Sequence, residues 1–110
     1  MVYATPAGTA WQRELLASAA GSPSLAFSPL GEPAVSYHDE SAQAIKLAMY
    51  VDREWQHVLV EQSGKDQQGL WHGDFTLTSL AFTPSGQPAV AYYDRHNGTI
   101  RVAVGTITSR

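Results

Sequence analysis

The residues best suited to bind a ligand lie in three polar segments that separate apolar stretches of the chain. The longest segment, 63–76, contains a tryptophan, a histidine and an aspartate. An indole in a polar loop offers a flat apolar surface on which a sugar ring or a base can stack. The segments 39–44 and 94–99 both begin with an aspartate. The candidate ligand-binding residues are Trp71, His72, Asp74, Asp39, Asp94, Arg95, His96 and Asn97.

Each of these residues also has a structural interpretation. Trp71 would pack on a neighbouring sheet instead of binding a ligand. An aspartate before a turn accepts hydrogen bonds from the backbone N–H groups that follow it. Because Asp39 and Asp94 recur at one repeat position, this turn role is favoured over a ligand or cation site. Tyr37 and Tyr92 also recur, and we expect them to pack between sheets.

The spacing of the reactive side chains predicts neither a catalytic nor a metal site. The 4 histidines are scattered without an H-x-x-x-H pair, and no cysteine supplies a thiolate ligand. The chain lacks a G-x-S-x-G motif, the glycine-rich phosphate-binding motifs, and paired carboxylates suited to glycoside hydrolysis. We therefore expect a protein that is not an enzyme and has no cofactor.

Composition argues against two classes of partner. The 110-residue chain has a formal net charge of −3, so neither nucleic acid nor an anionic membrane should attract it. No apolar run approaches the roughly 18 residues of a membrane helix. The small residues at 17–20 are similar to a signal-peptide cleavage site, but Arg13 and Glu14 do not suit the apolar segment before it. The compartment stays unknown, with the cytoplasm as the default.

An internal repeat determines the predicted architecture. Ser24–Tyr50 and Ser79–Gly105 align without a gap, and about half of their positions are identical. Each copy contains short apolar segments separated by prolines, a glycine and then a polar turn, which predicts antiparallel strands. The second copy has Asn97-Gly98 in its polar turn, a pair typical of hairpins.

A tryptophan-containing strand is predicted before each of the two repeat copies. Residues 11–16 match residues 55–60. Residues 11–20 are rich in helix formers, but the matching Val58–Val60 segment favours a strand. The chain is then all-β and forms one unit, 1–110, built from four-stranded antiparallel meanders. Its parts are an outer strand at 11–23, a complete meander at 24–62, a long loop at 63–76 and three strands at 77–105.

The pattern S-L-A-x-x-P-x-G-x-P-x-V-x-Y-x-D resembles a repeat in many bacterial proteins that are predicted to be β-propellers. It fits 24–39 and 79–94, and the repeat length and short strands are typical of propeller blades. The resemblance implies that 24–27 and 79–82 line a central channel and that the tryptophan strands lie outermost. A single β-sandwich with a duplicated pair of hairpins is the alternative.

Two blades in shifted phase cannot close a ring within one chain. Propellers have about four to eight blades, so a homotrimer with six is favoured, and a homotetramer would have eight. The strand at Trp11 of one copy would complete the Ala89-containing blade of the next, as a head-to-tail contact. Alternatively, the chain is a fragment of a longer propeller.

The expected function is that of a non-catalytic ligand-binding module, with carbohydrate as the ligand. Two-blade chains that trimerise are known among fucose-binding lectins, and the similarity is one of architecture. The Arg/Glu/Trp sugar triad of those lectins does not match the repeats. The alternative is a structural or protein-interaction ring without a small-molecule ligand.

Overall fold

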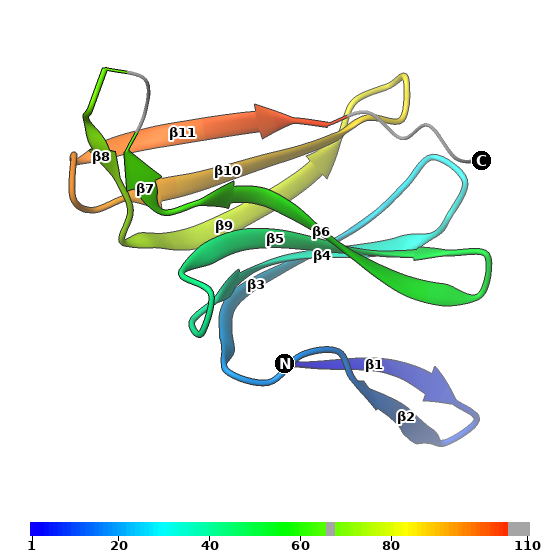
Figure 1. Ribbon diagram of the computed structural model, residues 1–110. Helices are drawn as coiled ribbons and strands as arrows, with labels where there is room; N and C mark the ends of the chain where they lie inside the picture. The colour runs from blue at the N-terminus through cyan, green and yellow to red at the C-terminus, as the bar shows by residue number, and fades with distance from the viewer. Residues whose placement is uncertain (66–67, 106–110) are drawn as a thin grey trace.

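The computed structural model describes residues 1–65 and 68–105. The described residues form strands and turns with no helix, so the all-β prediction is confirmed, including the strand at Trp11. Figure 1 labels the strands. They are β1 (Val2–Ala7), β2 (Ala10–Leu15), β3 (Ala20–Phe27), β4 (Pro33–Asp39), β5 (Ala44–Val51), β6 (Glu54–Gln62), β7 (Gly64–Lys65), β8 (Trp71–His72), β9 (Phe75–Phe82), β10 (Pro88–Asp94) and β11 (Thr99–Val104).

The strands form three stacked layers. The N-terminal hairpin pairs β1 with β2, the first sheet is the four-stranded antiparallel meander β3-β4-β5-β6, and the second sheet is the three-stranded meander β9-β10-β11. Figure 1 shows the second sheet above the first sheet and the N-terminal hairpin below it. A short ladder of β7 and β8 lies in the connection between the two sheets.

The two sheets repeat each other further than the sequence alignment predicts. Ala20 pairs with Asp39 in the first sheet, and Phe75 pairs with Asp94 in the second. In both sheets a β-bulge then shifts the register, so each first strand begins earlier than predicted. The left-handed residues around the bulges also correspond: Ala19 (φ 51°) and Ser22 (52°) match Asp74 (58°) and Leu77 (57°).

These pairings correct two predicted boundaries. The predicted outer strand 11–23 is divided, because β2 ends at Leu15 and residues from Ala20 onward belong to the first sheet. The predicted loop 63–76 contains β7 and β8, and it ends early because Phe75 already pairs in β9. Residues 66 and 67 of that loop lie outside the described residues.

The N-terminal hairpin has the same register as the outer half of the first sheet. Pro6 lies opposite Trp11 as Tyr50 lies opposite Trp55, and a two-residue turn follows in both hairpins. β1 was not predicted from the sequence, because its proline and small residues do not match the apolar strand β5. The Trp11 strand therefore has a backbone partner in its own chain.

The core lies between the first and second sheets. Its buried residues are Ala34, Ile45 and Leu47 from the first sheet and Phe75, Leu80, Val90 and Tyr92 from the second. Ser36 is completely buried there, and its Oγ donates a hydrogen bond to Thr78 Oγ1 at 2.9 Å. Burial of this apolar surface holds the two sheets face to face, as in a stack of sheets.

Candidate functional site

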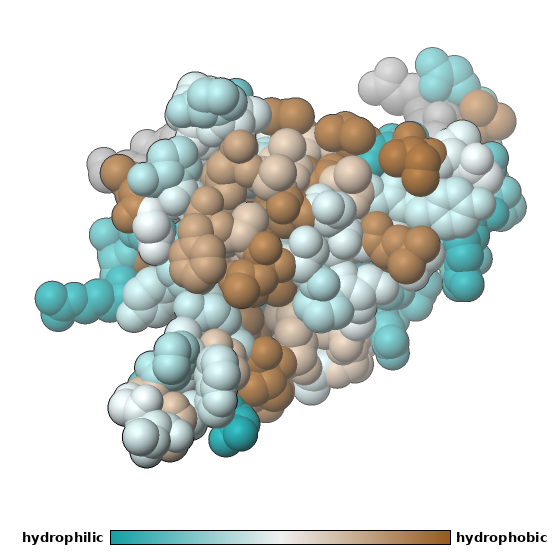
Figure 2. All heavy atoms as spheres, turned by 180° about the vertical axis from the view of Figure 1, so that it is seen from behind, coloured by the Kyte–Doolittle hydropathy of each residue, from teal (hydrophilic) through white to brown (hydrophobic). Residues whose placement is uncertain are grey.

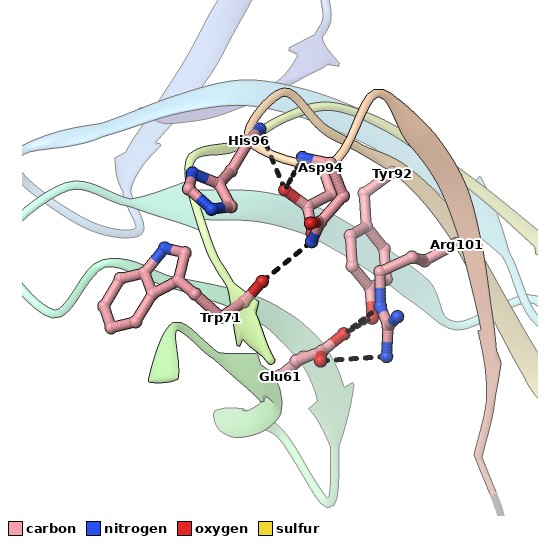
Figure 3. Close-up of polar contacts among 7 residues, drawn as sticks. Glu61, Trp71, Tyr92, Asp94, His96 and Arg101 are labelled. Carbon is pink, nitrogen blue, oxygen red and sulfur yellow. Dashed lines mark hydrogen bonds and ion pairs between the residues drawn. The ribbon is translucent and has the colours of Figure 1, made fainter. Parts of the chain in front are cut away.

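The structure brings several of the predicted ligand-binding residues together at one end of the second sheet (Figure 3). Trp71 comes from β8, while His96 and Asn97 come from the turn after β10. The Asn97 side-chain amide donates to the Trp71 carbonyl oxygen at 2.8 Å. The Trp71 and His96 rings lie edge to face, with centroids 6.4 Å apart. Trp71 is 43 % exposed, so this indole is accessible to a ligand.

An ion pair extends this group along the edge of the second sheet. The Arg95 guanidinium donates to Asp74 Oδ1 at 2.6 Å, and the Arg95 backbone N–H donates to the Asp74 carbonyl at 3.2 Å. Both side chains are more than half exposed, so the ion pair itself contributes little to stability. Arg95 directly precedes His96, so the ion pair adds an exposed cation and an exposed anion to this group.

Asp94 holds the turn in place. It is completely buried, and its Oδ1 accepts hydrogen bonds from the backbone N–H groups of His96 (3.0 Å) and Asn97 (3.3 Å). Burial alone would raise the pKa of the Asp94 carboxyl, but hydrogen bonds from Asn97 and the turn N–H groups outweigh burial and lower that pKa. Asp94 is therefore engaged with its own turn.

Asp39 performs the same task in the first sheet. Its Oδ1 accepts from the backbone N–H groups of Ser41 and Ala42, both at 3.1 Å, and its Oδ2 lies 2.9 Å from Lys46 Nζ. The hydrogen bond from Lys46, together with that from Ser41, holds the pKa of the Asp39 carboxyl well below its usual range. Of the two interpretations of the recurring aspartates, these contacts support the turn role.

The backbone of His72 pairs with Gly64, while its side chain lies outside the described structure.

A polar clamp links the two sheets near this group (Figure 3). Arg101 Nε donates to Glu61 Oε1 at 2.7 Å, its terminal nitrogen donates to Oε2 at 3.0 Å, and the Tyr92 hydroxyl also donates to Oε1. Burial, with help from the Glu61 hydrogen bond, raises the pKa of Tyr92 to about 12. Because Glu61 belongs to β6 and the other two residues belong to the second sheet, the clamp fixes the sheets relative to each other.

The outer face of the second sheet is apolar and exposed. Ile100, Val102 and Val104 are 69 %, 66 % and 56 % exposed. They alternate along β11 with residues that contact the first sheet, so they point away from it. At the equivalent positions of the first sheet, Ile45 and Leu47 are 0 % and 3 % exposed, because the second sheet covers them.

The first sheet has a complementary exposed face. Leu25 and Phe27 are 52 % and 55 % exposed, whereas the equivalent Leu80 is 7 % exposed and Phe82 packs on the core. Figure 2 shows apolar surface extending across the middle of the rear of the molecule. The two exposed faces thus correspond to the two halves of the buried interface between the sheets.

Two clefts lie where neighbouring layers meet, one between the N-terminal hairpin and the first sheet and one between the two sheets. Between the N-terminal hairpin and the first sheet, a cleft of about 250 Å³ contains Trp55. The indole N–H donates to Glu14 Oε2 at 3.1 Å, and the ring meets the Tyr3 ring edge to face at 5.1 Å. The second cleft, between the two sheets, is an apolar groove of about 300 Å³ without a tryptophan. Its lining includes Leu47, Met49, Val58, Pro88, Val104 and Gly105.

These faces and clefts were not predicted from the sequence, although part of the pattern that indicates them is present. The alternation of Ile100, Val102 and Val104 with Arg101 and Ala103 predicts a strand with one apolar face. Which of the two faces is covered depends on the order in which the layers stack, and periodicity does not specify that order.

The described residues contain no group of three or more histidine, aspartate or glutamate side chains arranged to hold a metal ion. Within the same part of the chain, no helix has the length and apolar character needed to cross a bilayer. No family model, no curated protein and no solved structure matches this chain.

Proposed function

We propose that this chain is a non-catalytic, self-assembling β-propeller to which each copy contributes two blades. The observation that carries the proposal is the exposure of Ile100 and Val102, whose counterparts Ile45 and Leu47 in the first sheet are core residues. An apolar face of this kind marks a surface that another protein layer covers. The first sheet and the second sheet would be successive blades, because each presents one face to the layer before it and one to the layer after it.

The same geometry supports closure by identical copies. The outer face of the second sheet in one copy would cover Leu25 and Phe27 in the next, as the first sheet already covers Leu80 within a chain. Such head-to-tail contacts close into a ring when the rotation between layers suits the number of copies. A homotrimer with six blades is favoured over a homotetramer with eight, since propellers have about four to eight blades.

The mass of the native assembly tests this proposal. Light scattering or native mass spectrometry should give a multiple of the 11.9 kDa chain, with a trimer expected. Val102→Lys places a charge on the exposed face and should yield monomers, whereas the control Thr99→Lys, on the other face of β11, should leave the assembly intact. A wild-type monomer at high concentration would contradict assembly from copies and favour a longer chain that supplies the other blades.

We propose carbohydrate as the ligand, bound beside Trp71 and His96. Two accessible rings next to the exposed Arg95–Asp74 pair combine a stacking surface with hydrogen-bonding groups, and sugars are recognised by such combinations. A glycan array should detect binding that Trp71→Ala abolishes and that Leu70→Ala, in the same connection, preserves. Absence of binding to every glycan would support the alternative, a structural or protein-interaction ring without a small-molecule ligand.

A further inference from the structure

Two strands of this chain, β1 and β11, occupy equivalent positions in their layers. Ala48 of β5 lies opposite His57, and Ala4 of β1 lies opposite Arg13 in the same register of the N-terminal hairpin. By the repeat between the two sheets, Ala103 of β11 corresponds to Ala48. Among the described strands, β11 pairs only with β10, so one of its edges lacks the partner that β6 provides for β5.

We infer that β2 of one copy completes the second sheet of another copy, and that β1 must leave β2 for this to happen. The inference rests on the proposed self-assembly and specifies its joint. The edge of β2 that pairs with β1 in the hairpin is the edge that would pair with β11 of another copy. That edge can pair with only one strand at a time, so β1 and β11 compete for it. The ladder lost with β1 is replaced by a similar ladder with β11, in which Arg13 lies opposite Ala103 and Gln12 opposite Val104.

The apolar groove between the two sheets supports this exchange, because it is the place where a tryptophan from β2 would lie. At the first junction Trp55 contacts Tyr3 and Glu14. The equivalent positions at the second junction are Leu47 and Val58, which line the groove.

Trp11 occupies in β2 the place that Trp55 occupies in β6, and it is 59 % exposed in the single chain. Gly105, which directly follows β11, stands where the first sheet has Tyr50, so no side chain at this position competes with the indole for space. An apolar groove lined by leucine and valine is a suitable environment for an aromatic anchor from a second copy.

The same exchange covers both exposed faces. When the second sheet of one copy takes over β2 of the next, its outer face lies against the first sheet of that copy. Ile100 and Val102 then bury Leu25 and Phe27, as Ile45 and Leu47 already cover Leu80 within one chain. A shallow depression of about 270 Å³, lined by residues that include Leu77, Tyr93 and Ile100, lies on the face to be covered. One contact between copies therefore accounts for the edge of β11 that no described strand pairs with, the apolar groove and both apolar faces.

Cysteine pairs test the exchange directly, because the chain has no cysteine of its own. The pair Arg13→Cys with Ala103→Cys should form disulfides between copies, giving covalent oligomers on a non-reducing gel up to the mass of the native assembly. The matched pair Arg13→Cys with Ala4→Cys should form a disulfide within single chains only in dilute, dissociated protein. Residues directly opposite on paired strands are close enough for such bonds.

The outcomes separate this inference from the proposed function. A monomeric wild-type mass would overturn the self-assembly itself. The exchange alone would be overturned by an oligomeric mass in which the Arg13→Cys, Ala103→Cys variant forms no disulfide between copies. An oligomer in which the Arg13→Cys, Ala4→Cys variant is completely cross-linked within single chains would overturn it equally.

The contribution of Trp11 to the joint is measured separately. Trp11→Ala should raise the dissociation concentration of the assembly by about 30-fold, because it removes the aromatic anchor from the groove. Trp71→Ala is the control and should leave the dissociation concentration unchanged. Equal dissociation of the two variants would contradict the placement of Trp11 in the groove.

Discussion

Tyr92 shows how one side chain connects packing with electrostatics. Its ring packs edge to face on Phe75 in the core, with centroids 5.3 Å apart, while its hydroxyl donates to Glu61 across the junction of the two sheets. The phenol must remain protonated to donate this hydrogen bond, and burial opposes its ionisation. Arg101 compensates the charge of Glu61 from the second sheet with two hydrogen bonds.

Stability should therefore fall in alkaline solution, and Tyr92→Phe should reduce this fall. The pKa of Tyr92 is raised from 10.0 to about 12 in the folded chain. Because this pKa is raised on folding, the protonated Tyr92 hydroxyl contributes its full stabilisation below pH 10. This stabilisation is lost as the pH rises toward about 12. Between pH 9 and 11, we expect the free energy of unfolding of Tyr92→Phe to fall by roughly 1 kcal/mol less than that of the wild type.

Denaturant titrations at the two pH values measure this difference. Tyr93→Phe, on the same strand but on the opposite face, is the control and should retain the alkaline loss of the wild type. An equal loss in all three proteins would show that the Tyr92 proton does not contribute.

The residues of the candidate site were partly predictable from the sequence. The polar segments identified Trp71, His96 and Asn97 as candidate ligand-binding residues, and the structure brings these three together. The clamp formed by Glu61 and Arg101 was not predictable, because it depends on how β6 of one sheet meets β11 of the other. Such contacts between layers leave no regular spacing in the sequence.

At the scale of elements, the bulges before Ser24 and Ser79 explain why strand boundaries were predicted less well than strand identities. Each bulge contains a non-glycine residue with a left-handed backbone, Ser22 or Leu77. A serine or a leucine does not predict a left-handed backbone, because glycine and asparagine are the residues that usually adopt it. The residues before the bulge were therefore assigned to the outer strand 11–23 in the first copy and to the loop 63–76 in the second, although they pair in the first and second sheets.

Leu77→Gly should stabilise the chain, in contrast to most leucine-to-glycine substitutions. Leu77 is 68 % exposed and has φ of 57°, so little burial is lost and backbone strain is relieved. We expect a net gain of about 0.5 kcal/mol after the entropy cost of glycine is included. Leu25→Gly, at a position in β3 that is exposed in the single chain and has no positive φ, should instead lose about 1 kcal/mol. Both values refer to dilute, dissociated protein, in which no other copy covers either leucine. Thermal unfolding of both variants measures the contrast, and a similar loss in both would show that the backbone at Leu77 is unstrained.

At the scale of the whole molecule, the antiparallel meanders and their repetition were predictable, but their stacking was not. Periodicity identifies strands with an apolar face, and the aligned copies identify equivalent strands. The partner of β2 could not be deduced, because Val2–Ala7 does not match β5 in sequence and is recognised as its equivalent only from the shared register.

Removal of residues 1–7 should strengthen association between copies. In the proposed exchange, β1 occupies the edge of β2 that a second copy requires, so the competent fraction of chains is reduced. A chain without β1 should associate about tenfold more tightly, measured by sedimentation at several concentrations. The control Thr5→Ser retains β1 and should associate like the wild type. Weaker association without β1 would mean that β1 supports the joint instead of competing for it.

The connection that carries β7 and β8 has a further consequence. A short connection leads from β2 into the first sheet, whereas the long one leads from β6 into the second sheet, so Trp71 occurs once per copy. In the proposed ring, identical sites would recur around one face at fixed spacing. Trp71 is 43 % exposed, so a sugar stacked on one site would stay partly in solvent and its affinity for that site would be low. A surface that displays many sugars would engage several sites together, so avidity rather than intrinsic affinity would select the target.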